Sequence, residues 1–236
     1  MPTATITVRR AGERFHTELP WLDSRHSFSF SRHYDPANMA HGLLLVNNDD
    51  RVAAGTGFST HPHRDMEIVT WVLQGALEHS DTTGHSGIIY PGLAQRMSAG
   101  RGIWHSEMNP SHEEVHFVQM WVLPDTESVD PDYQQLDINA DLDRGGLVAI
   151  ASGRDDHAAI RLQQRNAVLW GGRLRPGQRV EVPDAPHAHV FVAQGSAELE
   201  GAGALGEGDA ARLVVAGPRV LAAGAAGGEV LIWETA

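Results

Sequence analysis

Short apolar segments rich in β-branched and aromatic residues recur along the chain, and glycine, proline, asparagine and aspartate separate them. This composition favours strands interrupted by turns. No segment shows a long apolar period of 3.6 residues, so helices are expected to be few and short. The pattern predicts an all-β fold, either an antiparallel sandwich or a barrel. The expected strands include residues 42–46, 67–73, 116–122, 146–151, 167–174, 189–194 and 229–233.

A weak internal repeat divides the chain into two halves. Residues 68–78 (IVTWVLQGALE) match residues 188–200 (AHVFVAQGSAELE) in an apolar strand, a Gln-Gly turn and an acidic exit. A repeat of this kind indicates two units of similar structure. We therefore expect an N-terminal domain at residues 1–135 and a C-terminal domain at residues 136–236, connected by the acidic, proline-containing stretch 124–144.

Composition and charge limit which partners and metal ligands the protein can have. The net charge is −12 and the 18 basic residues are all arginine, which argues against direct nucleic-acid binding because phosphate contacts need clustered positive charge. There is no cysteine, so any metal must be held by nitrogen and oxygen ligands. The sequence shows neither a signal-peptide pattern nor a long apolar run, so a cytoplasmic protein without membrane contact is expected.

Two histidines spaced two residues apart, His61 and His63, precede Glu67. Residues two apart in a strand point to the same face, and Glu67 would share that face if the strand continued. His105 and Glu107 repeat the two-residue spacing further along the chain. If the two strands are neighbours, three imidazoles and a carboxylate converge. Such a set suits Fe(II), Mn(II), Ni(II), Cu(II) or Zn(II).

These residues fall within two motifs that resemble those of the cupin superfamily: G-x5-H-x-H-x3-E-x7-G at residues 55–75, and G-x2-H-x3-N at residues 102–109. The chain also resembles the pirin family of bicupins, most closely its bacterial quercetin 2,3-dioxygenase-like branch, in the segments SFSFSRHYDP, HPHRDMEIVTWVLQG and MSAGRGIWHSEMNPS. The similarity covers most of residues 20–125 and fades beyond them. It implies two cupin barrels packed together.

The resemblance implies one divalent transition metal per chain, preferably Fe(II), with Zn, Mn, Ni, Cu or Co as substitutes. The implied ligands lie in the N-terminal domain and are His61, His63, His105 and Glu107. In many other cupins the carboxylate ligand stands at the position of Glu67, so two glutamates compete for this role. We favour Glu107 as the ligand because the pirin-like motif ends in H-x-E, and we place Glu67 beside the ligands. Either glutamate is a candidate catalytic base.

Six other histidines are not expected to bind metal. Four of them are expected in loops or facing solvent: His79, His85, His112 and His116. His187 and His189 repeat the two-residue spacing, but the internal repeat does not align them with the first pair of histidines. It also places apolar residues, Leu221 and Ala223, near the positions of the second ligand pair. The C-terminal domain is therefore expected to bind no metal.

The resemblance implies an enzyme, a quercetin 2,3-dioxygenase-like oxidoreductase. A flavonol such as quercetin would contact the iron through its 3-hydroxyl and 4-carbonyl groups. A glutamate would deprotonate it, and O2 would cleave the central ring with release of carbon monoxide. The alternative is a non-enzymatic iron redox sensor that acts through an unidentified protein partner in transcription regulation. A third interpretation is an inactive bicupin that binds a small molecule.

Access of substrate to the metal distinguishes the enzyme from the sensor. Several apolar residues near the ligand strands are expected in the core by default, and otherwise as the lining of a cavity for an aromatic substrate. They are Trp71, Met97, Trp104, Met120 and Trp121.

Overall fold

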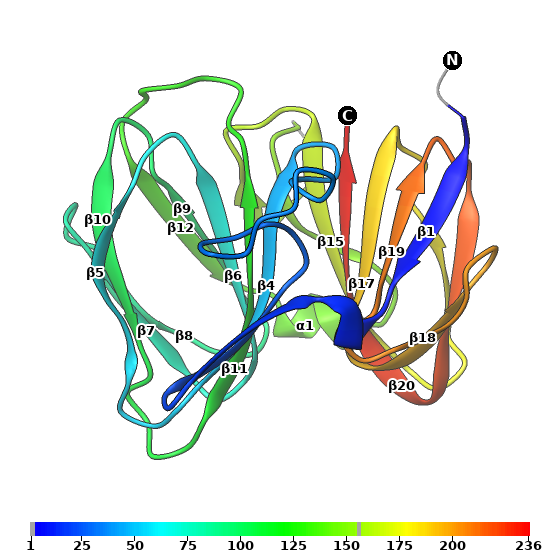
Figure 1. The fold of residues 1–236 in the computed structure, drawn as a ribbon, viewed down its shortest axis with the longest axis horizontal. Coiled ribbons are helices and arrows are strands. Elements are labelled where there is room, and N and C mark those ends of the chain that lie inside the picture. Colours follow the sequence, from blue (N-terminus) through cyan, green and yellow to red (C-terminus); the bar gives the residue numbers. More distant parts are fainter. Residues whose placement is uncertain (1–2, 155–156) are drawn as a thin grey trace.

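Two β barrels lie side by side and make up nearly all of the protein (Figure 1). The computed structural model describes residues 3–154 and 157–236. Helix within these ranges is confined to α1 (Asn139–Leu142) and a 3-10 turn, η1 (Ala11–Glu13). Neither is long enough to cross a membrane. The predicted all-β fold, two packed barrels with few short helices, is confirmed.

The first barrel consists of a seven-stranded and a four-stranded antiparallel sheet that face each other. The order of the larger sheet is β12 (Asp132–Asp137), β9 (Leu93–Ser98), β6 (Glu67–Gln74), β11 (Val115–Val122), β4 (Leu44–Val52), β3 (Leu22–His26) and β2 (Phe15–Leu19). The order of the smaller sheet is β5 (Gly57–His63), β10 (Ile103–Met108), β7 (Leu77–Asp81) and β8 (Ser86–Ile89).

The second barrel is built on one nine-stranded sheet. Its main order is β1 (Thr5–Arg9), β19 (Ala210–Val214), β17 (His187–Leu199), β20 (Arg219–Thr235), β15 (Ala167–Leu174), β13 (Val148–Ser152) and β14 (Ile160–Arg161). Two further strands complete it, with β16 (Arg179–Val182) on β20 and β18 (Gly203–Gly206) on β17.

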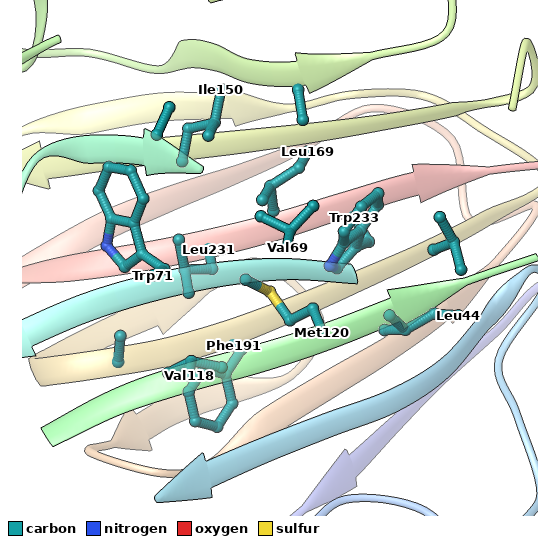
Figure 2. Close-up of a cluster of buried hydrophobic side chains, with 14 of the residues drawn as sticks. Leu44, Val69, Trp71, Val118, Met120, Ile150, Leu169, Phe191, Leu231 and Trp233 are labelled. Atoms are coloured by element: carbon teal, nitrogen blue, oxygen red, sulfur yellow. The ribbon is translucent and has the colours of Figure 1, made fainter. Parts of the chain in front are cut away.

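Strands β6 and β11 are buried on both faces, which explains their nearly continuous apolar sequences. Alternate residues point to opposite faces of a strand, so one set of side chains faces the interior of the first barrel and the other faces the second barrel. Figure 2 shows the core between the barrels. Its members include Val69, Trp71, Val118 and Met120 from the first barrel, and Leu169, Phe191, Leu231 and Trp233 from the second.

A buried polar contact also joins the barrels. The indole Nε1 of Trp71 on β6 donates a hydrogen bond of 2.6 Å to Glu229 Oε1 on β20. Arg173 Nε on β15 lies 3.2 Å from the other carboxylate oxygen of Glu229. The Glu229 carboxylate therefore has hydrogen-bond donors in both barrels.

Two segments connect the halves in ways that the periodicity of the sequence did not reveal. β1 pairs with β19, with Thr5 opposite Val214, so the first strand of the chain belongs to the second barrel. β12 lies within the stretch 124–144 and pairs with β9 of the first barrel. Part of the expected connector is therefore a sheet strand, and the expected boundary at residue 135 falls inside it.

Candidate metal centre

Three histidines from two neighbouring strands meet inside the first barrel. β5 and β10 pair antiparallel, with His61 opposite His105 and Ile103 opposite His63. Side chains of paired residues point to the same face, so the imidazoles project together. The ring centroid of His105 lies 4.5 Å from that of His61 and 5.0 Å from that of His63. One ring nitrogen from each histidine lies within 4.8 Å of the others.

The ring nitrogens are disposed as metal ligands. His61 Nδ1 lies 2.8 Å from the carbonyl oxygen of Ser59. A carbonyl only accepts, so Nδ1 carries the proton and Nε2 keeps its lone pair. Nε2 of His63 and both ring nitrogens of His105 are buried with no hydrogen-bond partner among the described residues. Such buried nitrogens are costly, and a bound cation would use their lone pairs. The donor set fits a divalent transition metal.

Burial keeps two of these imidazoles neutral. Together with the neighbouring histidines, it lowers the pKa of His63 to about 4 and the pKa of His105 to about 3. Metal ligation requires the lone pair of a neutral imidazole. Near neutral pH no proton has to leave His63 or His105 before a metal binds.

Glu107 is held from the opposite sheet. It follows His105 on β10 after an irregularity in the pairing, and it is buried. Its Oε1 accepts a hydrogen bond of 3.1 Å from Thr70 Oγ1 on β6, and its Oε2 accepts one of 2.6 Å from Gln119 Nε2 on β11. Gly57 permits the close approach of β5 here, because a Cβ at that position would collide with the carbonyl oxygen of Glu107. Glu107 lies outside the tight group of imidazole nitrogens but lines the same cavity.

Glu67 points toward the second half of the chain. β5 ends at His63, and the following turn contains Asp65 with a φ of 47°, so Glu67 begins β6 in the other sheet. The strand of His61 and His63 therefore does not continue to Glu67, and Glu67 does not share a face with these histidines. Its Oε2 accepts hydrogen bonds of 2.9 Å from Ser98 Oγ and from the backbone nitrogen of Gln163. Burial raises the pKa of this carboxyl group.

A cavity of about 450 Å³ opens beside the imidazoles, between the two sheets of the first barrel. Cavities of this size hold small organic ligands. Trp121 forms part of the wall next to the histidines: its ring lies edge-on to His63 at 4.8 Å, and its Nε1 donates to Gln119 Oε1 at 3.1 Å. The other aromatic residues of the wall are Trp21, Phe30 and Phe58.

The five apolar residues considered for core or cavity have different positions. Trp121 lines the cavity. Trp71 and Met120 lie in the core between the barrels, and Met97 lies in a smaller buried cluster. Trp104 is 51% exposed and belongs to neither. A tryptophan next to the ligand strands is therefore not by itself a sign of a substrate cavity.

His79 and His116 are buried, so the prediction that they lie in loops or face solvent is wrong. His79 lies on β7, with its ring centroid 5.4 Å from that of His105, and its Nε2 donates to Asp81 Oδ2 at 3.1 Å. His116 on β11 donates from Nε2 to Asp49 Oδ1 at 2.6 Å. Each histidine can be buried because a carboxylate accepts its N–H. The other two histidines of that set are exposed, as expected.

Within the described part of the chain, the three-histidine group is the only cluster of three or more potential ligands. Leu221 and Ala223 belong to the apolar core of the second barrel. His187 and His189 lie on β17, with ring centroids 5.2 Å and 6.4 Å from that of His41 in the first half. These histidines contribute to the contact between the barrels.

Comparison with known sequences identifies relatives along nearly the whole chain. A protein of Mycobacterium tuberculosis, provisionally named quercetin 2,3-dioxygenase, is 59% identical over 234 residues, which cover 98% of this chain and 96% of that protein. Quercetin 2,3-dioxygenase of Escherichia coli K12 is 39% identical over 198 residues, covering 83% of this chain and 84% of that protein. These names agree with the prediction of a quercetin 2,3-dioxygenase-like oxidoreductase.

Comparison with solved structures also identifies relatives along nearly the whole chain. The crystal structure of the bacterial pirin YhhW from Escherichia coli in complex with nickel(II) has a TM-score of 0.88 and 33% identity, covering 98% of this chain and 99% of that one. This relative and the three-histidine group indicate a site for one transition metal. The family model described as Pirin matches residues 7–122, which contain both motifs. The predicted resemblance is confirmed, and the chain belongs to the pirin family.

Proposed function

We propose that the chain is an Fe(II)-dependent dioxygenase that opens the central ring of quercetin or a related flavonol with O2 and releases carbon monoxide. The observation that supports this most directly is that three imidazoles, with buried nitrogens that have no hydrogen-bond partner among the described residues, lie beside a cavity of about 450 Å³ with aromatic walls. A redox sensor needs no internal space for a planar aromatic molecule. The names of the relatives are consistent with this activity.

We assign the metal to the N-terminal domain proposed at residues 1–135, and none to the domain proposed at residues 136–236. The assigned ligands are His61, His63, His105 and Glu107. When bound, the metal supplies Lewis acidity and a redox centre that brings the substrate and O2 together.

Glu107 is the base that we assign. The proton moves from the 3-hydroxyl oxygen of the flavonol to a carboxylate oxygen of Glu107. Thr70 and Gln119 hold this carboxylate in place before substrate enters, so little reorganisation precedes the transfer. Glu67 was the other candidate base. Its contacts with Ser98 and Gln163 favour a role in joining the barrels.

The aromatic walls position the substrate. Trp121 and Phe30 contact each other edge-on at 5.6 Å, and Trp21 and Phe58 do so at 5.3 Å, so the rings are held by packing before a ligand arrives. Flat apolar surfaces of this kind stack on the rings of a flavonol and displace water from the reacting centre. The cavity therefore favours a planar aromatic substrate.

The test is O2 uptake with quercetin by protein loaded anaerobically with Fe(II), with iron per chain measured in the same samples. His105→Ala removes an assigned ligand, and His112→Ala changes an exposed histidine as the matched control. We expect uptake with carbon monoxide release by the wild type and the control, and neither by His105→Ala. An absence of uptake at full iron occupancy would contradict the proposal and favour a redox sensor with a protein partner.

A further inference from the structure

The cavity has a second polar wall that the proposed reaction does not use. Ser24 and His26 on β3 and Asn48 and Asp50 on β4 are all buried and all line the cavity. These strands belong to the seven-stranded sheet, whereas the imidazoles project from β5 and β10 of the facing sheet. The polar wall therefore faces the metal centre across the cavity.

Asn48 presents a fixed donor to the cavity. His26 Nδ1 lies 2.9 Å from Asn48 Oδ1, and His26 Nε2 lies 2.9 Å from Thr17 Oγ1. Burial lowers the pKa of His26, so the ring is neutral, with Nδ1 donating to the Asn48 oxygen and Nε2 accepting from the threonine hydroxyl. This contact fixes the orientation of the amide. Asn48 Nδ2 then has no hydrogen-bond partner within residues 3–154 and 157–236.

Asp50 presents a second unpaired atom. Its Oδ1 is hydrogen-bonded to Ser24 Oγ, and its Oδ2 has no partner in the described part of the chain. Burial, together with the negative charges of Asp49 and Glu107, raises the pKa of Asp50 to about 8. A protonated Oδ2 can both donate and accept a hydrogen bond.

Unpaired polar atoms in a binding cavity select ligands by their hydroxyl groups. A site built to hydrogen-bond a hydroxyl rejects an analogue that lacks it, because the polar groups of the protein then remain buried and unpaired. The reacting 3-hydroxyl and 4-carbonyl groups belong at the metal, so the facing wall is free to recognise other parts of the same molecule. The two walls together suit an aromatic substrate that carries hydroxyl groups at both ends.

We propose that Asn48 Nδ2 and Asp50 Oδ2 bind hydroxyl groups that the flavonol carries outside its reacting 3-hydroxyl and 4-carbonyl groups, so that the enzyme selects polyhydroxylated flavonols. This inference rests on the proposed flavonol chemistry for the identity of the ligand. It extends that chemistry by assigning two specificity-determining residues on the wall opposite the metal.

The test compares quercetin with 3-hydroxyflavone, which retains the reacting groups and lacks the other hydroxyls. Dissociation constants are measured without O2 on Fe(II)-loaded protein, by quenching of tryptophan fluorescence, so that binding is read independently of turnover. The variants are Asn48→Leu and Asp50→Leu. Asn47→Leu is the matched control, because Asn47 is next to Asn48 on the same strand, points to the opposite face and hydrogen-bonds to Ser27.

We expect each of the two test variants to weaken quercetin binding about tenfold, as for the loss of one hydrogen bond, and to leave 3-hydroxyflavone binding unchanged. The control should bind both flavonols like the wild type. If a leucine variant fails to fold, Asn48→Asp keeps the acceptor for His26, removes the Nδ2 donor and should show the same selective loss.

Three results would overturn the inference. In the first, the test variants bind quercetin as tightly as the wild type. In the second, they lose affinity for both flavonols equally, which would indicate a general disturbance of the cavity. In the third, the wild type binds neither flavonol, which removes the proposed function as well. Selective binding without O2 uptake would instead support the inference and contradict only the proposed reaction.

Discussion

Gln119 Nε2 lies 2.6 Å from Glu107 Oε2, so a residue of one sheet fixes a carboxylate that projects from the other. Thr70 completes the support through the second carboxylate oxygen. We predict that Gln119→Leu and Thr70→Val each lower kcat about 10-fold to 100-fold, the range measured when residues that orient metal-site groups are removed. Steady-state O2 uptake and iron per chain provide the measurement. An unchanged kcat in both variants would show that Glu107 does not depend on this support.

Metal content tests the histidine assignment directly. We predict that His105→Ala loses most of the bound iron, because it removes a buried member of a small ligand set. Replacement of both His187 and His189 by alanine should leave iron per chain unchanged, since these residues contribute to the contact between the barrels. Elemental analysis after anaerobic loading measures both. Loss of iron from the double variant would point to a metal site in the second barrel.

Removal of the metal is expected to destabilise the wild type. A metal that binds only the folded state adds about 2.7 kcal/mol to the free energy of unfolding when its free concentration is 100 times its dissociation constant. Chelation should therefore lower the Tm of the wild type and leave the Tm of His105→Ala nearly unchanged. Thermal unfolding with and without chelator measures the difference. Equal shifts in the two proteins would mean that the chelator acts elsewhere.

The raised pKa of Asp50 predicts that the free energy of unfolding depends on pH. Its folded pKa of about 8 lies above the ordinary value of 3.8, so its contribution to stability is fully present below pH 3.8 and is lost as the pH rises toward 8. Asp50→Asn cannot titrate. The free energy of unfolding of Asp50→Asn minus that of the wild type should therefore increase as pH rises, by at most about 1.4 kcal/mol per pH unit.

Urea unfolding between about pH 5 and pH 8 provides this measurement. Asp209→Asn is the control, because contacts with the backbone of Ala11 and Gly206 and with Arg10 outweigh burial and lower the pKa of Asp209. Its difference from the wild type should be constant in this range, since both the folded and the unfolded carboxyl groups are ionised there. A pH-independent difference for Asp50→Asn would contradict the assignment of a raised pKa.

The pair Trp71 and Glu229 is predicted to stabilise the contact between the barrels. Glu229→Leu leaves the buried indole N–H without its acceptor, which costs about 1–3 kcal/mol of the free energy of unfolding. Combining Glu229→Leu with Trp71→Phe removes both partners, so the double variant should be less destabilised than the sum of the single variants. Urea unfolding of the four proteins measures the coupling. Additive effects would mean that the hydrogen bond contributes nothing.

Much of the site follows from the sequence because strand geometry is local. The two-residue spacings place His61 with His63 and His105 with Glu107, whatever the rest of the fold. The same reasoning fails for Glu67, because residues two apart share a face only within one strand. The turn around Asp65 ends that strand and takes the chain into another sheet. Pairing between distant strands decides which groups meet.

The burial of His79 and His116 could not be derived for a related reason. A polar side chain is buried when a partner satisfies it. For His116 that partner is Asp49, on a strand far away in the sequence. For His79 a local signal exists, because Leu77, His79 and Asp81 alternate along one strand and share a face. The neighbours across the sheet, which complete the buried environment, are not visible in the sequence.

The position of β1 has a consequence for the order of folding. Thr5–Arg9 pairs with Ala210–Val214, so during synthesis β1 must wait for a partner made about two hundred residues later. Contacts between distant residues form slowly, because closing a long loop costs conformational entropy before the strand pairing contributes any favourable free energy. During synthesis the first barrel can assemble while β1 remains an unpaired edge. We expect the second barrel to close last, when β1 pairs with β19 in the sheet that also contains β20.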